Sequence, residues 1–185
     1  MSPHADYVYD VFFSYKRHGL TLDWTRLVHT RLKFWLTQEI AVREAKLFVD
    51  EDCIDVGDRW PAHLKQAVQV SRCMVCVWSP SYFQSSWCVS EWASFRERLI
   101  APMRFHDGEH FPEEARSVEW LDVAPYTSTM PAFLTSPRAM DLEDLLKGFA
   151  KQVAKIVREC PAFQPDWPVE EAPALAVPRI ELARL

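Results

Sequence analysis

The stretch CMVCVW, residues 73–78, is an unbroken apolar run of strand length. A central strand of a parallel sheet is covered by helices on both faces, so its apolar residues do not alternate with polar ones. The sequence Ser79-Pro80-Ser81 that follows is typical of a turn and ends the run. We therefore predict that residues 73–78 form the central strand of a parallel sheet.

The segments on either side of this run predict the other strands and the helices. Aromatic and β-branched runs indicate strands at 7–14, 46–49, 99–105 and, as a short fifth one, 117–123. Apolar residues at helical spacing indicate helices at 21–38, 86–98 and 142–157, and a further one that starts at Pro61. The alternation predicts an α/β fold, an open parallel sheet of four to five strands with helices on both faces.

In such a sheet a ligand binds in the crevice beyond the carboxyl ends of the strands. Three loops are expected to border that crevice, namely residues 14–19, 50–60 and 79–86. The third loop leads directly into the sequence SSWCVSEW, residues 85–92, which places a carboxylate, Glu91, between two tryptophans. This loop and the start of its helix are therefore the first place to look for a site.

The composition restricts the class of protein. The chain has 185 residues, of which 49% are hydrophobic and 25% charged, which fits one soluble domain. A net charge of -5 gives no basic footprint for nucleic acid or an anionic membrane, and no apolar run approaches the ~18 residues of a membrane span. The opening MSPHADY lacks the apolar core of a signal peptide, and the five cysteines are an odd number. We expect a cytoplasmic protein with reduced thiols.

The last part of the chain differs from the rest in its proline content. Five prolines fall within the final 25 residues, at positions 161, 165, 168, 173 and 178. Proline excludes a continuous helix or a central strand there. We predict one domain at 1–160 and a Pro-rich, extended or disordered tail at 161–185.

Four segments, in this order, resemble a TIR (Toll/interleukin-1 receptor) domain. They are YDVFFSYK at 9–16, DEDCIDVGDRWPAHLKQAV at 50–68, CMVCVWSPSYFQSSWCVSEW at 73–92 and LIAPMRFHDGEHFP at 99–112. The resemblance implies a flavodoxin-like fold. It also implies one of two activities, since some TIR domains are scaffolds that bind other TIR domains and others cleave NAD at the nicotinamide–ribose bond. The cleaving members use a glutamate four residues after a tryptophan on the third helix, which corresponds here to Trp87 and Glu91.

The chain is similar in size to stand-alone microbial members of the family that act in antiphage defence. For such a member the resemblance implies self-association through TIR–TIR contacts, NAD as a substrate and not a cofactor, and a downstream effector that responds to the product. The product is then linear, cyclic or conjugated ADP-ribose. One loop departs from the receptor pattern, with Asp52, Asp55, Gly57 and Asp58 in place of Arg-Asp…Pro-Gly. Partner contacts of that loop in receptors therefore do not transfer to this chain.

The position of Glu91 suits this chemistry. Cys88, Trp92, Phe95 and Leu99 recur at helical spacing and predict a buried stripe, and Glu91 lies about 100° from Trp92, at its border. We therefore expect a half-sheltered carboxylate with Trp87 one turn away on the same side. The alternative is a glutamate that only benefits from the helix dipole.

A single carboxylate is enough for NAD cleavage. Most glycosidases need a second one to protonate the leaving group, whereas nicotinamide leaves a pyridinium as a neutral molecule. The other walls of the predicted pocket are Ser14, Tyr15, Lys16, Arg17 and Trp60. Lys16 and Arg17 can pair with the NAD diphosphate, although surface solubility is an equal alternative. Trp78 is a further candidate for the base pocket, with core packing as its more ordinary role.

Other motifs do not predict sites. Cys73 and Cys76 are three apart in a strand and so point to opposite faces, which excludes a shared metal. His106 and His110 flank Gly108 in a polar run that indicates a turn, so no metal site is expected. With four glycines the chain has no glycine-rich phosphate loop. The sequence leaves an NAD-cleaving enzyme, a non-catalytic interaction scaffold and an effector that mimics host TIR signalling.

Overall fold

The computed structural model describes residues 6–17, 19–50 and 62–171. Its sheet consists of β1 (Tyr9–Tyr15), β2 (Leu47–Val49), β3 (Ser71–Trp78), β4 (Ile100–Arg104) and β5 (Leu121–Asp122). The strands lie in the order β2-β1-β3-β4-β5, and every pair of neighbours is parallel. This order is the flavodoxin-like one, so the predicted fold is confirmed.

The apolar run at 73–78 lies in β3, which forms the centre of the sheet. β3 pairs with β1 on one side, where Phe12 faces Met74, and with β4 on the other, where Ala101 faces Val75. Each residue from 73 to 78 has a relative exposure of 0%. An apolar side chain is therefore needed at every one of these positions, which explains the unbroken run.

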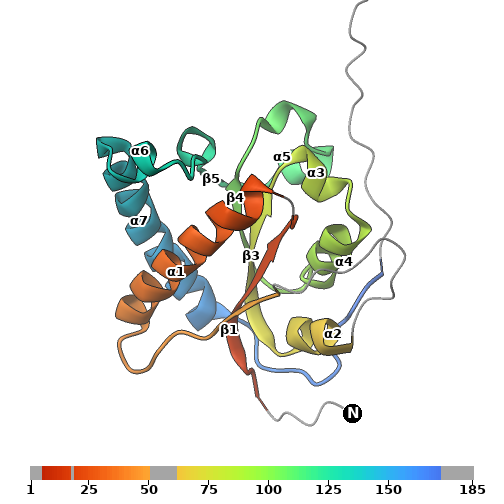
Figure 1. Cartoon of the computed structure of the whole chain (residues 1–185). Coiled ribbons are helices and arrows are strands. Elements are labelled where there is room, and N and C mark those ends of the chain that lie inside the picture. The colour runs from red at the N-terminus through yellow and green to blue at the C-terminus, as the bar shows by residue number, and fades with distance from the viewer. Residues whose placement is uncertain (1–5, 18, 51–61, 172–185) are drawn as a thin grey trace, which may run out of the picture.

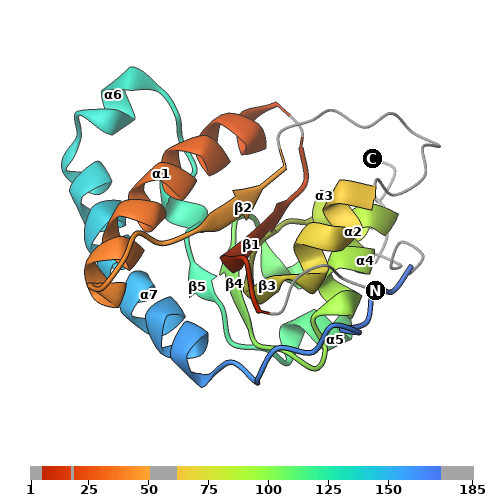
Figure 2. The same ribbon diagram turned by 90° about the horizontal axis from the view of Figure 1, so that it is seen from below.

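Helices cover both faces of the sheet (Figures 1 and 2). On one face lie α1 (Leu20–Ile40) and α7 (Pro137–Glu159), preceded by the short α6 (Pro131–Leu134). On the other lie α2 (Ala62–Gln69), α3 (Pro80–Phe83), α4 (Ser86–Ser94) and α5 (Glu113–Arg116). Each face has its own apolar core, with Val75 and Leu146 in the first and Met74 and Phe83 in the second.

Some predicted elements differ from those in the structure. The helix expected at 86–98 ends at Ser94. The Ser90 and Ser94 hydroxyls bond back to carbonyls four residues earlier, and the Arg98 guanidinium donates to the Ser94 carbonyl oxygen. The chain then continues in turns, which leaves Leu99 41% exposed, so the predicted stripe is wrong at that position. The strand expected at 117–123 is limited to Leu121–Asp122, because α5 and a turn occupy the preceding residues.

The carboxylate inside β1 has a structural partner. Asp10 is 1% exposed, and both of its oxygens accept hydrogen bonds from the Arg43 guanidinium. The backbone N–H of Lys46 donates to the same carboxylate at 2.9 Å. Asp10 thus fastens β1 to the segment that leads into β2.

Residues 161–171 contain no helix or strand and lie against the rest of the domain, at the edge where β1 and β3 begin (Figure 2). Trp167 is 3% exposed, and its indole N–H donates to the Tyr7 hydroxyl at 3.0 Å. The backbone N–H of Glu170 donates to Ser94 Oγ at 2.9 Å, which ties this segment to the end of α4. The part of the expected tail that the structure describes is therefore extended and packed, and residues 172–185 lie outside the described part.

Among the described residues, no helix has the length and apolar character needed to cross a membrane.

Candidate functional site

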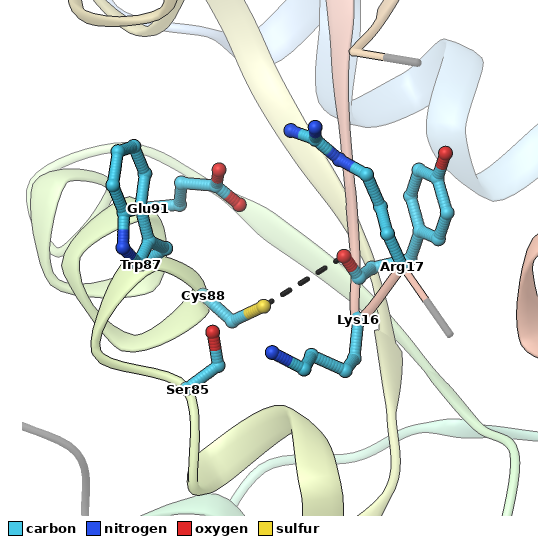
Figure 3. Close-up of a pocket in the computed structure, with 7 residues that line it drawn as sticks. Lys16, Arg17, Ser85, Trp87, Cys88 and Glu91 are labelled. Atoms are coloured by element: carbon cyan, nitrogen blue, oxygen red, sulfur yellow. Dashed lines mark hydrogen bonds between the residues drawn. The ribbon is translucent and has the colours of Figure 1, made fainter. Parts of the chain in front are cut away.

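A pocket of about 190 Å³ lies beyond the carboxyl ends of β1 and β3, at the predicted crevice (Figure 3). Its walls come from the end of β1, the loop after it, and the start of α4. The lining residues are Tyr15, Lys16, Arg17, Ser85, Trp87, Cys88 and Glu91. The structure thus brings four of the predicted site residues into one pocket with Glu91.

Glu91 is more deeply buried than the sequence suggested. It is 6% exposed, whereas its place beside the stripe predicted a half-sheltered carboxylate. Its side chain points from α4 toward β1 (Figure 3), and Ser14 Oγ donates a hydrogen bond to Glu91 Oε2 at 2.5 Å. The prediction missed the depth because it considered α4 alone, and the end of β1 covers the open side of that helix.

Burial also changes the proton affinity of this carboxyl group. Removal from water raises the pKa of Glu91 from 4.5 to about 7, since the charged form is disfavoured there. The hydrogen bond from Ser14 and the charge of Arg17 both lower that pKa, and the charge of Asp50 raises it. Glu91 is therefore close to half ionised at neutral pH, a condition common for groups at functional sites.

Ser14 and Tyr15 are adjacent in sequence but face opposite sides of the sheet, as the period of a strand requires. Ser14 points to the α4 side, where it meets Glu91. The Tyr15 side chain belongs to the core under α1 and α7, and its hydroxyl donates to the Asp50 carbonyl oxygen at 3.2 Å. Only the backbone of Tyr15 approaches α4, with its carbonyl oxygen 3.7 Å from Cys88 Sγ. The ring of Tyr15 therefore points away from Glu91, and its backbone is the part that approaches the α4 side of the pocket.

The two basic residues of the pocket differ in their partners. Arg17 forms an ion pair with Asp50, which is 7% exposed at the end of β2. Lys16 lines the pocket close to Ser85 and Cys88 (Figure 3), and no carboxylate in the described ranges forms an ion pair with it. Within the described part of the pocket, Lys16 is thus a cation outside the Arg17–Asp50 ion pair, and its charge can meet an anionic group of a ligand.

The tryptophans have different locations. Trp87 is partly buried and lines the pocket one turn before Glu91, as predicted, and its indole ring lies beside the carboxyl group (Figure 3). Trp78 is 0% exposed and packs edge-on against Trp92, so it belongs to the core. Trp60, the remaining predicted wall, lies outside the described residues.

The sequence did not indicate that Ser85 and Cys88 line the pocket. Cys88 is three residues before Glu91 and thus on the same helical face, a signal that was available. Burial, followed by the charge of Glu91, raises the pKa of the Cys88 thiol to about 12. The thiol therefore stays neutral at physiological pH and is a poor nucleophile.

Two motifs for which no site was predicted, Cys73/Cys76 and residues 106–110, have the predicted backbone geometry. Cys73 lies in the core on the α1 side of the sheet and Cys76 in the core on the α4 side. Residues 108–110 form one turn of 3-10 helix, and the side chains of Asp107, Glu109 and His110 lie close enough together to hold an ion. That group is largely exposed to solvent, and exposed acidic groups of this kind are common without a metal.

The sequence profile of the TIR domain family matches residues 11–133, which is more than half of the chain. Two solved structures are similar to it. The TIR domain of the Toll-related receptor TRR-2 from Hydra magnipapillata has 19% identity over 77% of this chain and 98% of that one, with a TM-score of 0.48. The TIR domains of the activated Roq1 resistosome, which directly recognises the pathogen effector XopQ, have 22% identity over 80% of this chain and 84% of that one, with a TM-score of 0.39. No curated protein matches the chain significantly. The profile match, over a sheet with the flavodoxin-like strand order, shows that this chain belongs to the TIR domain family.

Proposed function

We propose that this TIR domain cleaves the nicotinamide–ribose bond of NAD⁺, with Glu91 as the catalytic carboxylate. The observation that carries the proposal is the placement of Glu91, a buried carboxylate that Ser14 holds at 2.5 Å in a pocket beside Trp87. A glutamate that only benefited from a helix dipole would extend into solvent. Glu91 instead remains in a site whose desolvation is costly, which is typical of functional carboxylates.

The reaction needs only one such group. The C1′–N bond breaks, its electron pair stays on the nicotinamide nitrogen, and the ribose becomes an oxocarbenium ion. An ionised Glu91 stabilises that positive charge in a water-poor site, where a fixed charge is most effective. A water molecule then adds to C1′ and loses a proton, which gives ADP-ribose. Addition of another nucleophile gives a cyclic or conjugated ADP-ribose.

The pocket accepts the reactive end of the substrate. Its volume of about 190 Å³ is below the ~300–1,000 Å³ of a pocket for a drug-sized ligand, so it suits the nicotinamide riboside part of NAD⁺. The Trp87 ring beside Glu91 can stack on the pyridinium, a contact worth about 0.5 to 2 kcal/mol. Lys16 at the pocket wall can meet a phosphate, and Arg17 can do so while it keeps its pair with Asp50.

The substrate also favours the charged state of Glu91. A pyridinium cation within the pocket lowers the pKa of a nearby carboxyl group, because an opposite charge stabilises the carboxylate. Binding of NAD⁺ therefore ionises a group whose pKa in the free protein is about 7. The same reasoning predicts weaker binding of the uncharged reduced dinucleotide.

The biological setting proposed for this activity is antiphage immune signalling in the cytoplasm. The ADP-ribose product would then act on a downstream effector, and self-association through TIR–TIR contacts would raise the activity. A non-catalytic TIR–TIR scaffold, or an effector that mimics host TIR signalling, is the alternative that the following experiment separates.

The experiment compares nicotinamide release from NAD⁺ by the wild type, Glu91→Gln and Glu91→Ala, at high protein concentration with a crowding agent. Glu97→Gln is the matched control, since Glu97 is an exposed glutamate six positions further along the chain. We expect release by the wild type and the control, and a loss of about 100-fold or more in both Glu91 variants. Absence of release from the wild type favours the scaffold, and equal release from all four proteins moves the catalytic site elsewhere.

A further inference from the structure

Two consecutive hydrogen bonds connect Glu91 to Ser14 and Ser14 to Tyr82, and the three residues come from three different elements. Tyr82 of α3 lies with its hydroxyl 2.8 Å from Ser14 Oγ at the end of β1. Ser14 Oγ in turn donates to Glu91 Oε2 of α4 at 2.5 Å. The relative exposures of Tyr82, Ser14 and Glu91 are 0%, 1% and 6%, so water does not replace these contacts easily.

When Glu91 is ionised, the number of available protons determines which group donates in each of the two hydrogen bonds. A serine hydroxyl has one proton, and Ser14 uses it for the bond to the carboxylate. The contact between Ser14 and Tyr82 then requires that the tyrosine hydroxyl donates. Tyr82 polarises Ser14, and Ser14 stabilises the negative charge, because consecutive hydrogen bonds strengthen one another in a medium of low dielectric constant.

Tyr82 is suited to this role because it keeps its proton. Burial raises the pKa of the Tyr82 hydroxyl well above 10, and the nearby thiols and Glu91 raise it further. The group is therefore a permanent donor throughout the physiological range. When Glu91 is protonated, the whole chain can reverse, since Glu91 can then donate to Ser14 and Ser14 to Tyr82.

We infer that Tyr82 is a positioning residue for Glu91, which acts through Ser14 to orient the carboxyl group and to favour its ionised form. This inference rests on the proposed function for its consequence in catalysis, and on the hydrogen-bond geometry for the effect on Glu91 itself. Neither the sequence motif Trp87…Glu91 nor the pocket lining contains Tyr82.

Other groups also influence the ionisation of Glu91, and the experiment must hold them constant. The titratable and charged groups that face Glu91 or its immediate neighbours come from β1 and its loop, β2, β3, α3 and α4, and they are Lys16, Arg17, Asp50, Cys76, Tyr82 and Cys88. Replacement of Tyr82 by phenylalanine removes one hydroxyl and leaves the other five side chains in place.

The test is Tyr82→Phe in the full chain, with Tyr7→Phe as the matched control. Tyr7 also has a hydrogen-bonded hydroxyl, which donates to the Pro161 carbonyl oxygen at 3.0 Å, but it lies at the opposite edge of the sheet. We expect Tyr82→Phe to raise the pKa of Glu91 by about 0.5 to 1 pH unit, the effect of one hydrogen bond. The control is expected to leave that pKa unchanged.

Two readouts measure the shift independently. The first is an NMR titration of the ¹³C-labelled Glu91 carboxyl group, assigned by its absence in Glu91→Gln, and it needs no enzymatic activity. The second is the pH profile of nicotinamide release, in which Tyr82→Phe should lose three- to tenfold at pH 6 and approach the wild type at pH 9. A purely structural role would lower the activity by the same factor at every pH.

Each outcome decides the inference. A carboxyl titration that is unchanged in Tyr82→Phe overturns it, whatever happens to activity. If the wild type releases no nicotinamide, the proposed function fails while the NMR titration still tests the chain of hydrogen bonds. If Tyr82→Phe does not fold, Tyr82→Met, which also removes the hydroxyl and keeps an apolar side chain, is titrated in its place, and an unchanged pKa of Glu91 again overturns the inference.

Discussion

Ser14 and Glu91 are 77 positions apart, and the serine hydroxyl donates to the buried carboxylate at 2.5 Å. This contact joins the end of β1 to the first turns of α4. The contact also affects the pKa of Glu91. Burial raises that pKa, and the hydrogen bond from Ser14 offsets only part of the rise. The ionisation of Glu91 is therefore set by two opposing effects, burial and the bond from Ser14.

The pH dependence of stability should show the cost of burying Glu91. The pKa of this group is raised from 4.5 to about 7 in the folded protein, so the native state binds more protons than the unfolded state between these values. Stability from this group is therefore complete below pH 4.5 and is lost as the pH rises through 7, by about 3 kcal/mol in total. Urea denaturation of the wild type and Glu91→Gln should show the variant gaining relative stability from pH 5 to pH 8. A difference that does not vary with pH would mean that the carboxylate is well solvated.

The rate of nicotinamide release should depend on the same ionisation. Since the reaction needs the carboxylate, kcat/KM is expected to rise as the pH increases through about 7, the pKa of Glu91 in the free protein. The dependence of kcat should lie at lower pH, because the bound pyridinium favours the ionised form. Initial rates at subsaturating and saturating NAD⁺ between pH 5.5 and 9 measure both profiles. A kcat/KM that falls over this range would require a protonated Glu91 and would contradict the mechanism.

The two members of the ion pair at the pocket, Arg17 and Asp50, should shift the pKa of Glu91 in opposite directions. The charge of Arg17 lowers the pKa of Glu91 and the charge of Asp50 raises it. Arg17→Gln is therefore expected to move the kcat/KM profile to higher pH, and Asp50→Asn to move it to lower pH. Arg17→Gln should also raise KM, if the guanidinium binds a phosphate.

The control for Arg17→Gln and Asp50→Asn is Lys155→Gln, which removes an exposed cation of α7 that forms an ion pair with Glu159 at 3.8 Å. It is expected to leave both the profile and KM unchanged. Shifts of the same sign in Arg17→Gln and Asp50→Asn would show that the pair acts through local structure and not through charge.

The segment 161–171 should contribute to the stability of the domain. Trp167 is 3% exposed and lies 5.2 Å from the buried Arg98 guanidinium, in addition to its bond with Tyr7. Trp167→Ala is expected to cost about 3 kcal/mol or more, the usual result for a buried tryptophan. Asp166→Ala, at the exposed neighbouring position, should stay within about 0.5 kcal/mol. A small effect of Trp167→Ala on the free energy of unfolding would place the domain boundary at 160, as the proline content suggested.

The sequence predicted those parts of the molecule that depend on long, regular patterns. The apolar run at 73–78 and the alternation of elements were enough for the sheet and its covering helices, because burial on two faces leaves a clear mark on composition. The family resemblance added Trp87 and Glu91, and the pocket in the structure contains both. These features need no knowledge of contacts between distant residues.

The remaining features depend on tertiary packing. Tyr82 was missed because α3 has only four residues, too few for a helical period to be visible. The depth of Glu91 depends on Ser14, which packs against α4 from a strand, and the direction of the Tyr15 ring depends on where β1 ends. The burial of Trp167 was hidden by the surrounding prolines, since such a composition excludes regular structure but not packing.

The most direct test of the central claim is nicotinamide release at pH 8 by the wild type and Glu91→Gln, measured on samples whose folding has been checked by urea denaturation. At this pH the ionised Glu91 lowers the stability of the wild type, a cost that Glu91→Gln does not carry, and the urea denaturation shows directly that both samples are folded. We expect release by the wild type and a decrease of about 100-fold or more in the folded variant. Undiminished release by folded Glu91→Gln would show that the buried carboxylate is not the catalytic group.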